Sequence, residues 1–152
     1  MIDPKFIGYE FPEFVYLVEP FQLRLFAKAI GEKAALYQDE AAAQKAGYTS
    51  LPAPPSFPFS VSMNPTDPLD LLAPMELQVA RLLHGSQSFT YHQPICAGDR
   101  IRVTRRISDI TAKKGGALEF ITYDIGYVNV ERNALVCEAQ QVLVYRNPET
   151  AQ

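Results

Sequence analysis

The hydrophobic positions along the chain change their period near residue 85. Before this point apolar residues recur at helical spacing, as at Leu23, Phe26, Ala27 and Ile30, which lie at i, i+3, i+4 and i+7. After it, apolar and polar residues alternate over long runs, which is typical of strands with one buried face. Helices followed by long strands predict an α+β fold of one domain, residues 1–152, in which a curved antiparallel sheet wraps around an apolar helix.

The predicted elements follow from this pattern. In the first half they are a strand over residues 14–18, a helix from Pro20 to Ile30, a second helix over residues 38–46 capped by Asp39, an apolar segment over 57–63, and a helix from Pro74 to His84–Gly85. In the second half they are strands over residues 86–95, 101–110, 118–129 and 134–145. Alternation predicts Phe89 and Tyr91 on one face of their strand, and Ser88, Thr90 and His92 on the other.

Composition and charge narrow the class of protein. A net charge of −3 and a pI of about 5.4 argue against general nucleic-acid binding. No apolar stretch approaches the ~20 residues that a membrane span needs, and the first residues carry no signal-peptide pattern. Two cysteines without a CxxC motif and only two histidines predict reduced thiols and no metal site. We therefore expect a cytoplasmic protein without metal or cofactor.

Three segments in this order resemble the MaoC-like dehydratase family, specifically its N-terminal-type domain, which has the hot-dog fold. They are FAKAIGEKAALYQDEAA at residues 26–42, APPSF at 53–57, and LHGSQSFTYHQP at 83–94 with AGD at 97–99. The family adds or removes water across the double bond of enoyl thioesters in fatty-acid metabolism, carried on coenzyme A or a carrier protein. The resemblance implies such a thioester as the substrate, with coenzyme A serving as its carrier rather than as a cofactor.

The loop that carries the chemistry in related R-specific enoyl-CoA hydratases departs from their pattern here. Those enzymes read Gly-Asp-x-Asn-Pro-(apolar)-His, in which the Asp and His activate a water. In this chain Gly31 and Leu36 match, but Glu32 replaces the Asp, Tyr37 replaces the His, and alanines stand at positions 34 and 35. Tyrosine has an ordinary pKa near 10, so it is a poor general base, and losing acid–base assistance typically costs about 10²–10⁴ in rate.

The candidate catalytic residues are Glu32, Tyr37 and His84. Each has an alternative role: Glu32 as a solvated carboxylate at a helix end, Tyr37 as a half-buried core residue, and His84 as a backbone cap before Gly85. His84 is included among the candidates because histidine titrates near neutrality.

The candidate substrate-binding residues form three groups. Pro55, Ser56 and Phe57 open a helix, whose free N–H groups polarise a carbonyl oxygen. Gln87 is a polar residue on a predicted strand. Arg100 and Arg102 belong to an arginine-rich stretch that fits either the phosphates of coenzyme A or a solvated strand face.

Three functions remain open on the sequence. The first is a pocket-forming, catalytically degenerate subunit that pairs with a catalytic hot-dog subunit, as N-terminal-type domains of this family do. The second is a homodimeric hydratase that uses Glu32 with Tyr37 or His84. The third is an acyl-CoA binding or regulatory module without turnover. Each predicts at least a dimer, because a small curved sheet leaves an edge that needs covering.

Overall fold

The computed structural model describes residues 1–147, so the last five residues of the predicted single domain lie outside the described part. Its centre is one antiparallel sheet of five strands in the order β1-β3-β4-β5-β2. The strands are β1 (Phe14–Leu17), β2 (Leu82–Tyr91), β3 (Arg100–Lys113), β4 (Leu118–Asn129) and β5 (Ala134–Arg146). The α+β architecture predicted from the sequence is confirmed.

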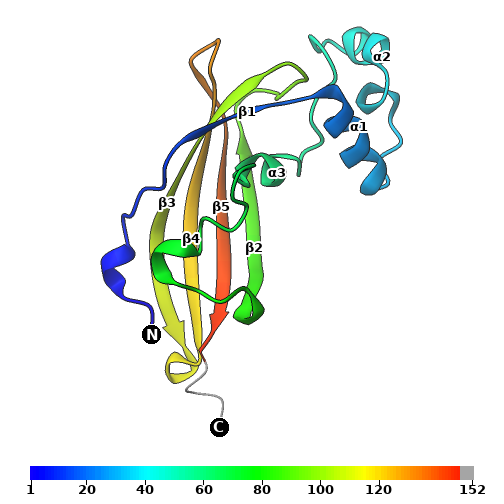
Figure 1. The fold of residues 1–152 in the computed structure, drawn as a ribbon. Helices are drawn as coiled ribbons and strands as arrows, with labels where there is room; N and C mark the ends of the chain where they lie inside the picture. The colour runs from blue at the N-terminus through cyan, green and yellow to red at the C-terminus, as the bar shows by residue number, and fades with distance from the viewer. Residues whose placement is uncertain (148–152) are drawn as a thin grey trace.

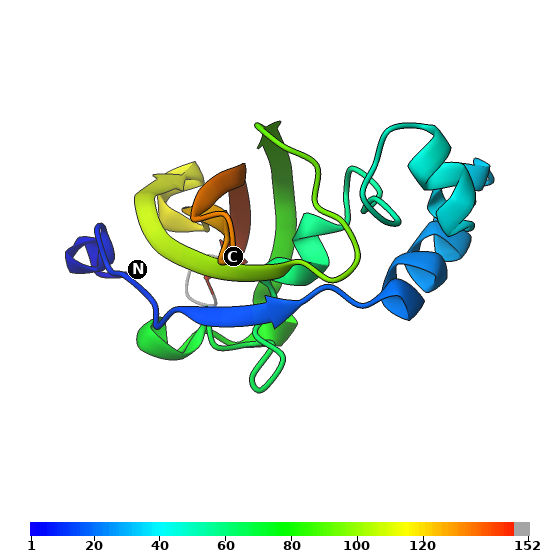
Figure 2. The ribbon, with the colours of Figure 1, turned by 90° about the horizontal axis from the view of Figure 1, so that it is seen from above.

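The helices are short and lie in two places (Figure 1). Helix α3 (Pro58–Ser62) lies against one face of the sheet, whereas α1 (Pro20–Ala29) and α2 (Glu40–Lys45) lie beyond the end of the sheet where β1 leads into α1. Single 3₁₀ turns complete the fold: η1 (Pro4–Phe6), η2 (Ala35–Tyr37), η3 (Ala73–Met75), η4 (Val79–Arg81) and η5 (Lys114–Gly116). Seen from above, α1 and α2 stand clear of the strands, and α3 lies beside β2 (Figure 2).

The inner face of the sheet, which faces α3, is clearest in β4, where buried and part-buried residues alternate. In β4 every second residue is buried, and Tyr123 and Tyr127 on this face are fully buried. The Tyr127 hydroxyl donates to the Pro58 carbonyl at 2.9 Å, and Val61 of α3 is fully buried. The apolar segment therefore lies within the curve of the sheet, as the sequence predicts.

Helix caps agree with the sequence near the N-terminus. Helix α1 begins at Pro20, and the Asp39 carboxylate accepts the Ala42 N–H at 2.8 Å at the start of α2. The second helix is shorter than predicted, because Asp39 itself has extended backbone and leaves only Glu40–Lys45 helical.

The predicted helix from Pro74 to Gly85 is wrong. Only the turns η3 and η4 form there, and His84 and Gly85 belong to β2. Glu76 has a left-handed backbone (φ 52°), which ends the first turn. From Leu82 onward the backbone pairs with β5, where Leu82 faces Tyr145. A bulge follows at Gly85, where a β-carbon would lie 3.0 Å from the Val142 carbonyl oxygen.

Candidate functional site

The loop after α1 places Glu32 close to the end of the helix. Gly31 has φ 75°, a conformation that glycine adopts at little cost, and the Glu32 N–H bonds the Ala27 carbonyl at 2.8 Å. The Glu32 carboxylate then accepts the Ala34 N–H at 2.8 Å. One of its oxygens is thus bonded within its own loop.

Tyr37 ends the turn η2, which is held against α1 because Arg24 donates its Nε–H to the Gln38 carbonyl at 2.9 Å. Partial burial raises the pKa of the Tyr37 phenol above its ordinary value, and the neighbouring Tyr48 and Glu32 raise it further. Tyr37 is therefore neutral at physiological pH, and its hydroxyl is able to donate a hydrogen bond. A phenol with a raised pKa cannot replace the histidine as a general base.

Tyr91, at the end of β2, joins the sheet to the segment before α3. Its hydroxyl donates to the Pro55 carbonyl oxygen. Burial of the phenol raises its pKa, and the nearby Cys137 and Tyr37 act in the same direction. Tyr37, Tyr91 and Pro55 therefore gather at one end of α3, and both phenols are neutral.

The backbone at Ser56 differs from the helix N-terminus that the sequence predicts. Helix α3 begins two residues later, at Pro58, and the Phe57 N–H is already bonded to the Pro54 carbonyl at 2.9 Å. Prolines at 54, 55 and 58 have no N–H. The Ser56 N–H forms no hydrogen bond with a described backbone group, and Ser56 is exposed. This segment therefore offers one free backbone N–H, that of Ser56, instead of the several that a helix N-terminus would offer. Phe57 is buried in the core.

His84 and Gln87 also face α3, but farther along β2. The His84 ring packs edge-on against Phe59, with ring centroids 5.5 Å apart. His84 and Tyr91 are seven positions apart along β2, a distance of roughly 20 Å at ~3.3 Å per residue. The structure therefore does not bring His84 to Glu32 and Tyr37. The other histidine, His92, lies on the outer face and pairs with Glu138 at 2.8 Å.

The arginine-rich stretch lies on β3, and each of its guanidinium groups has a carboxylate partner. Arg100 contacts Glu131 at 3.5 Å, and Arg102 contacts Glu13 at 3.8 Å. Both pairs are exposed and therefore weak, so they leave phosphate binding by Arg100 and Arg102 an open prediction.

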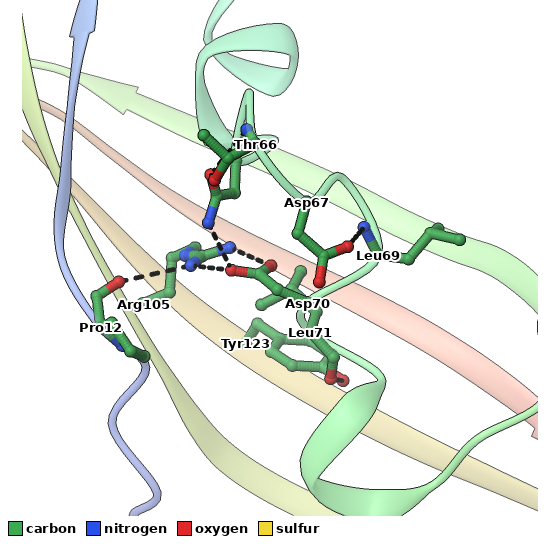
Figure 3. A network of polar contacts seen from close by, with 9 residues as sticks. Pro12, Thr66, Asp67, Leu69, Asp70, Leu71, Arg105 and Tyr123 are labelled. Carbon is green, nitrogen blue, oxygen red and sulfur yellow. Dashed lines mark hydrogen bonds and ion pairs between the residues drawn. The ribbon is translucent and has the colours of Figure 1, made fainter.

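Arg105 differs from its neighbours, because its side chain is fully buried. Both terminal nitrogens donate to the Asp70 carboxylate at 2.6 Å, and the guanidinium lies over the Phe14 ring, 4.9 Å from its centroid. Asn64 also donates to Asp70 at 3.0 Å. This network fastens the loop that contains Asp70 over the inner face of the sheet, where the Tyr123 hydroxyl donates to the Leu71 carbonyl at 3.3 Å (Figure 3).

Three of these features were not predicted from the sequence. Tyr48 and Tyr91 join Tyr37 only through the fold, and the partner of Arg105 lies 35 residues away in the chain. Among residues 1–147, no group of three His, Cys, Asp or Glu side chains is placed to hold a metal. In the same part of the chain, no helix is long and apolar enough to cross a membrane.

The five-stranded antiparallel sheet curved around α3 is a hot-dog fold, which solved structures share. The family model for the FAS1-like dehydratase domain region matches residues 5–139, and the chain belongs to this family. A UPF0336 protein of Saccharopolyspora erythraea is 38% identical over 146 residues, which cover 95% of this chain and 92% of that protein.

Solved structures share the fold at lower identity. The HadBC (3R-hydroxyacyl-ACP dehydratase) complex of Mycobacterium tuberculosis matches with TM-score 0.78 and 24% identity, over 91% of this chain and 96% of that chain. A MaoC-like dehydratase matches with TM-score 0.80 and 21% identity, over 95% of this chain and 43% of that chain. The ChsH1–ChsH2 complex of Mycobacterium tuberculosis matches with TM-score 0.71 and 21% identity, over 91% and 85%. The predicted resemblance to MaoC-like dehydratases is confirmed.

Proposed function

We propose that this chain is the pocket-forming, catalytically degenerate subunit of an acyl-thioester hydratase or dehydratase, and that a hot-dog partner supplies the water-activating Asp and His. The observation that carries the proposal is Tyr37. It stands where the histidine base belongs, and the pKa of its phenol is raised rather than lowered. Glu32 is half-buried beside it with one oxygen bonded to its own loop, and His84 lies roughly 20 Å along β2 from Tyr91.

The remaining groups suit binding of a thioester rather than activation of water. The Ser56 N–H and the neutral phenol of Tyr37 are donors at the same end of α3 as Tyr91. Donors of this kind stabilise a carbonyl oxygen that gains charge, without acid–base chemistry of their own. The apolar inner face between α3 and the sheet then accommodates the acyl chain.

A partner subunit is also supported by the solved relatives of the fold. HadBC and ChsH1–ChsH2 are both complexes of two different subunits. Among residues 1–147, β2 is an edge strand whose outer backbone pairs with no other strand, and Leu83 on it is 55% exposed. An uncovered edge of this length is a site of strand pairing.

The assembly is therefore expected to be at least dimeric. The full-length chain should run as a dimer or larger in multi-angle light scattering at micromolar concentration, or as a heteromer when co-expressed with a catalytic hot-dog subunit. A stable monomer under both conditions would contradict the proposed pairing.

The catalytic part of the proposal is tested with the isolated chain. We expect feeble or no hydration of crotonyl-CoA and longer enoyl-CoA substrates, because acid–base assistance is worth about 10²–10⁴ in rate. Acyl-CoA binding, measured by calorimetry, should persist. Robust turnover that Glu32→Ala or His84→Ala abolishes would show that the chain is an enzyme in its own right.

A further inference from the structure

Gln87 lies on the inner face of β2 between two contacts that join this strand to the α3 segment. On one side the Tyr91 hydroxyl donates to the Pro55 carbonyl, and on the other the His84 ring packs against Phe59. Gln87, Phe89 and Tyr91 share one face because they alternate along the strand. The Gln87 side chain therefore lies on the side of β2 that faces α3.

The amide of Gln87 is buried and unpaired. Both its oxygen and its nitrogen are inaccessible, and no described residue bonds either atom. Directly opposite on β5 lies Gln141, whose side chain is 6% exposed. Buried polar side chains in proteins nearly always have partners, since an unpaired amide costs free energy. The unpaired amide of Gln87, on an otherwise apolar and aromatic face, therefore requires an explanation.

We infer that Gln87, with Gln141 beside it, recognises an oxygen function on the acyl chain of the bound thioester. This inference rests on the proposed function. An amide both donates and accepts, so a hydroxyl group satisfies both of its atoms and a carbonyl oxygen satisfies its N–H. A saturated hydrocarbon chain leaves the amide unpaired.

The position of Gln87 also indicates where along the acyl chain the recognised oxygen lies. Gln87 and Tyr91 are four positions apart along β2, a distance of roughly 13 Å at ~3.3 Å per residue. The oxygen therefore lies well along the acyl chain, away from the thioester held near Ser56. The preferred substrate class is an oxygenated acyl thioester rather than a plain fatty acyl thioester.

The test compares decanoyl-CoA with a series of hydroxydecanoyl-CoA isomers, which carry the hydroxyl at successive carbons. Binding is measured by calorimetry to the full-length chain, to Gln87→Leu, and to the control Gln140→Leu, whose amide faces outward toward Asp124. At least one distal isomer should bind the natural chain about tenfold more tightly than decanoyl-CoA. Gln87→Leu should lose this preference while it still binds decanoyl-CoA, and Gln140→Leu should keep it.

The outcomes separate this inference from the function on which it rests. Equal binding of all isomers, or a preference that survives Gln87→Leu, overturns the inference and leaves the proposed function standing. Failure of every thioester to bind overturns both. The melting temperature gives a second readout: Gln87→Leu should match or exceed the natural chain, because it removes an unpaired buried amide. A clear drop in melting temperature would show that the amide is a structural partner within the sheet, and would also overturn the inference.

Discussion

Replacing Asp70 with alanine should destabilise the protein by about 3–5 kcal/mol, because it leaves the buried guanidinium of Arg105 without its counter-charge. The side chain of Arg105 is 0% exposed, and both of its bonds to Asp70 are 2.6 Å long. The Pro12 carbonyl and two aromatic rings also contact the guanidinium, but none of them carries a negative charge. Urea unfolding followed by circular dichroism measures the loss.

Two variants serve as controls for this prediction. Glu131→Ala removes the partner of the exposed Arg100 and should cost no more than about 1 kcal/mol. The double variant Asp70→Leu with Arg105→Met replaces both charges with apolar groups, and it should recover most of the stability lost in Asp70→Ala. An Asp70→Ala protein as stable as Glu131→Ala would show that the buried pair does not hold the loop.

The same pair predicts an acid-sensitive stability. Partial burial raises the pKa of Asp70, but the hydrogen bonds and charge of Arg105 outweigh this effect, so the pKa lies below its ordinary value of 3.8. Because the folded-state pKa is lowered, the stabilisation is complete above the ordinary carboxyl pKa and is lost as pH falls through the lowered pKa. The free energy of unfolding of Asp70→Ala should therefore fall less steeply with decreasing pH in this acidic range than that of the natural chain.

The third, fourth and fifth strands were predictable from the sequence because alternation and burial agree over long runs. The second strand was predicted at residues 86–95 but forms at Leu82–Tyr91. The fourth strand has the predicted bounds, residues 118–129, and each of its inward side chains is buried. The segment after Pro74 was not predictable in this way. Met75, Val79 and Leu82 have helical spacing, but pairing with β5 supplies the backbone hydrogen bonds of this segment from Leu82 onward. A short apolar run does not by itself separate these two outcomes.

The candidate site was predictable only where one loop contains it. Glu32 and Tyr37 are five positions apart, and the fold keeps them close enough for Glu32 to influence the Tyr37 phenol. Tyr91 and the pair of Arg105 with Asp70 depend on contacts between distant segments. The arginine-rich stretch is an example, because the spacing of its arginines did not indicate that Arg105 alone is buried in the core.

The second large effect is expected in the complex with a catalytic hot-dog subunit. Alanine in place of the histidine in the partner's Gly-Asp-x-Asn-Pro-x-His loop should lower the hydration rate by about 10²–10⁴, because that residue activates the water. Tyr37→Phe in this chain removes only a neutral hydrogen-bond donor, so its effect should stay within about tenfold. Glu32→Gln should be equally mild, since the amide oxygen still accepts the Ala34 N–H.

The most direct test of the degenerate-subunit role is the steady-state rate of crotonyl-CoA hydration by the reconstituted complex, measured for these three variants side by side. This role predicts that the rate is lost only when the partner's histidine is replaced, and that it is largely retained in Tyr37→Phe and Glu32→Gln. A loss of 100-fold or more in either variant of this chain, with the assembly intact by light scattering, would contradict it.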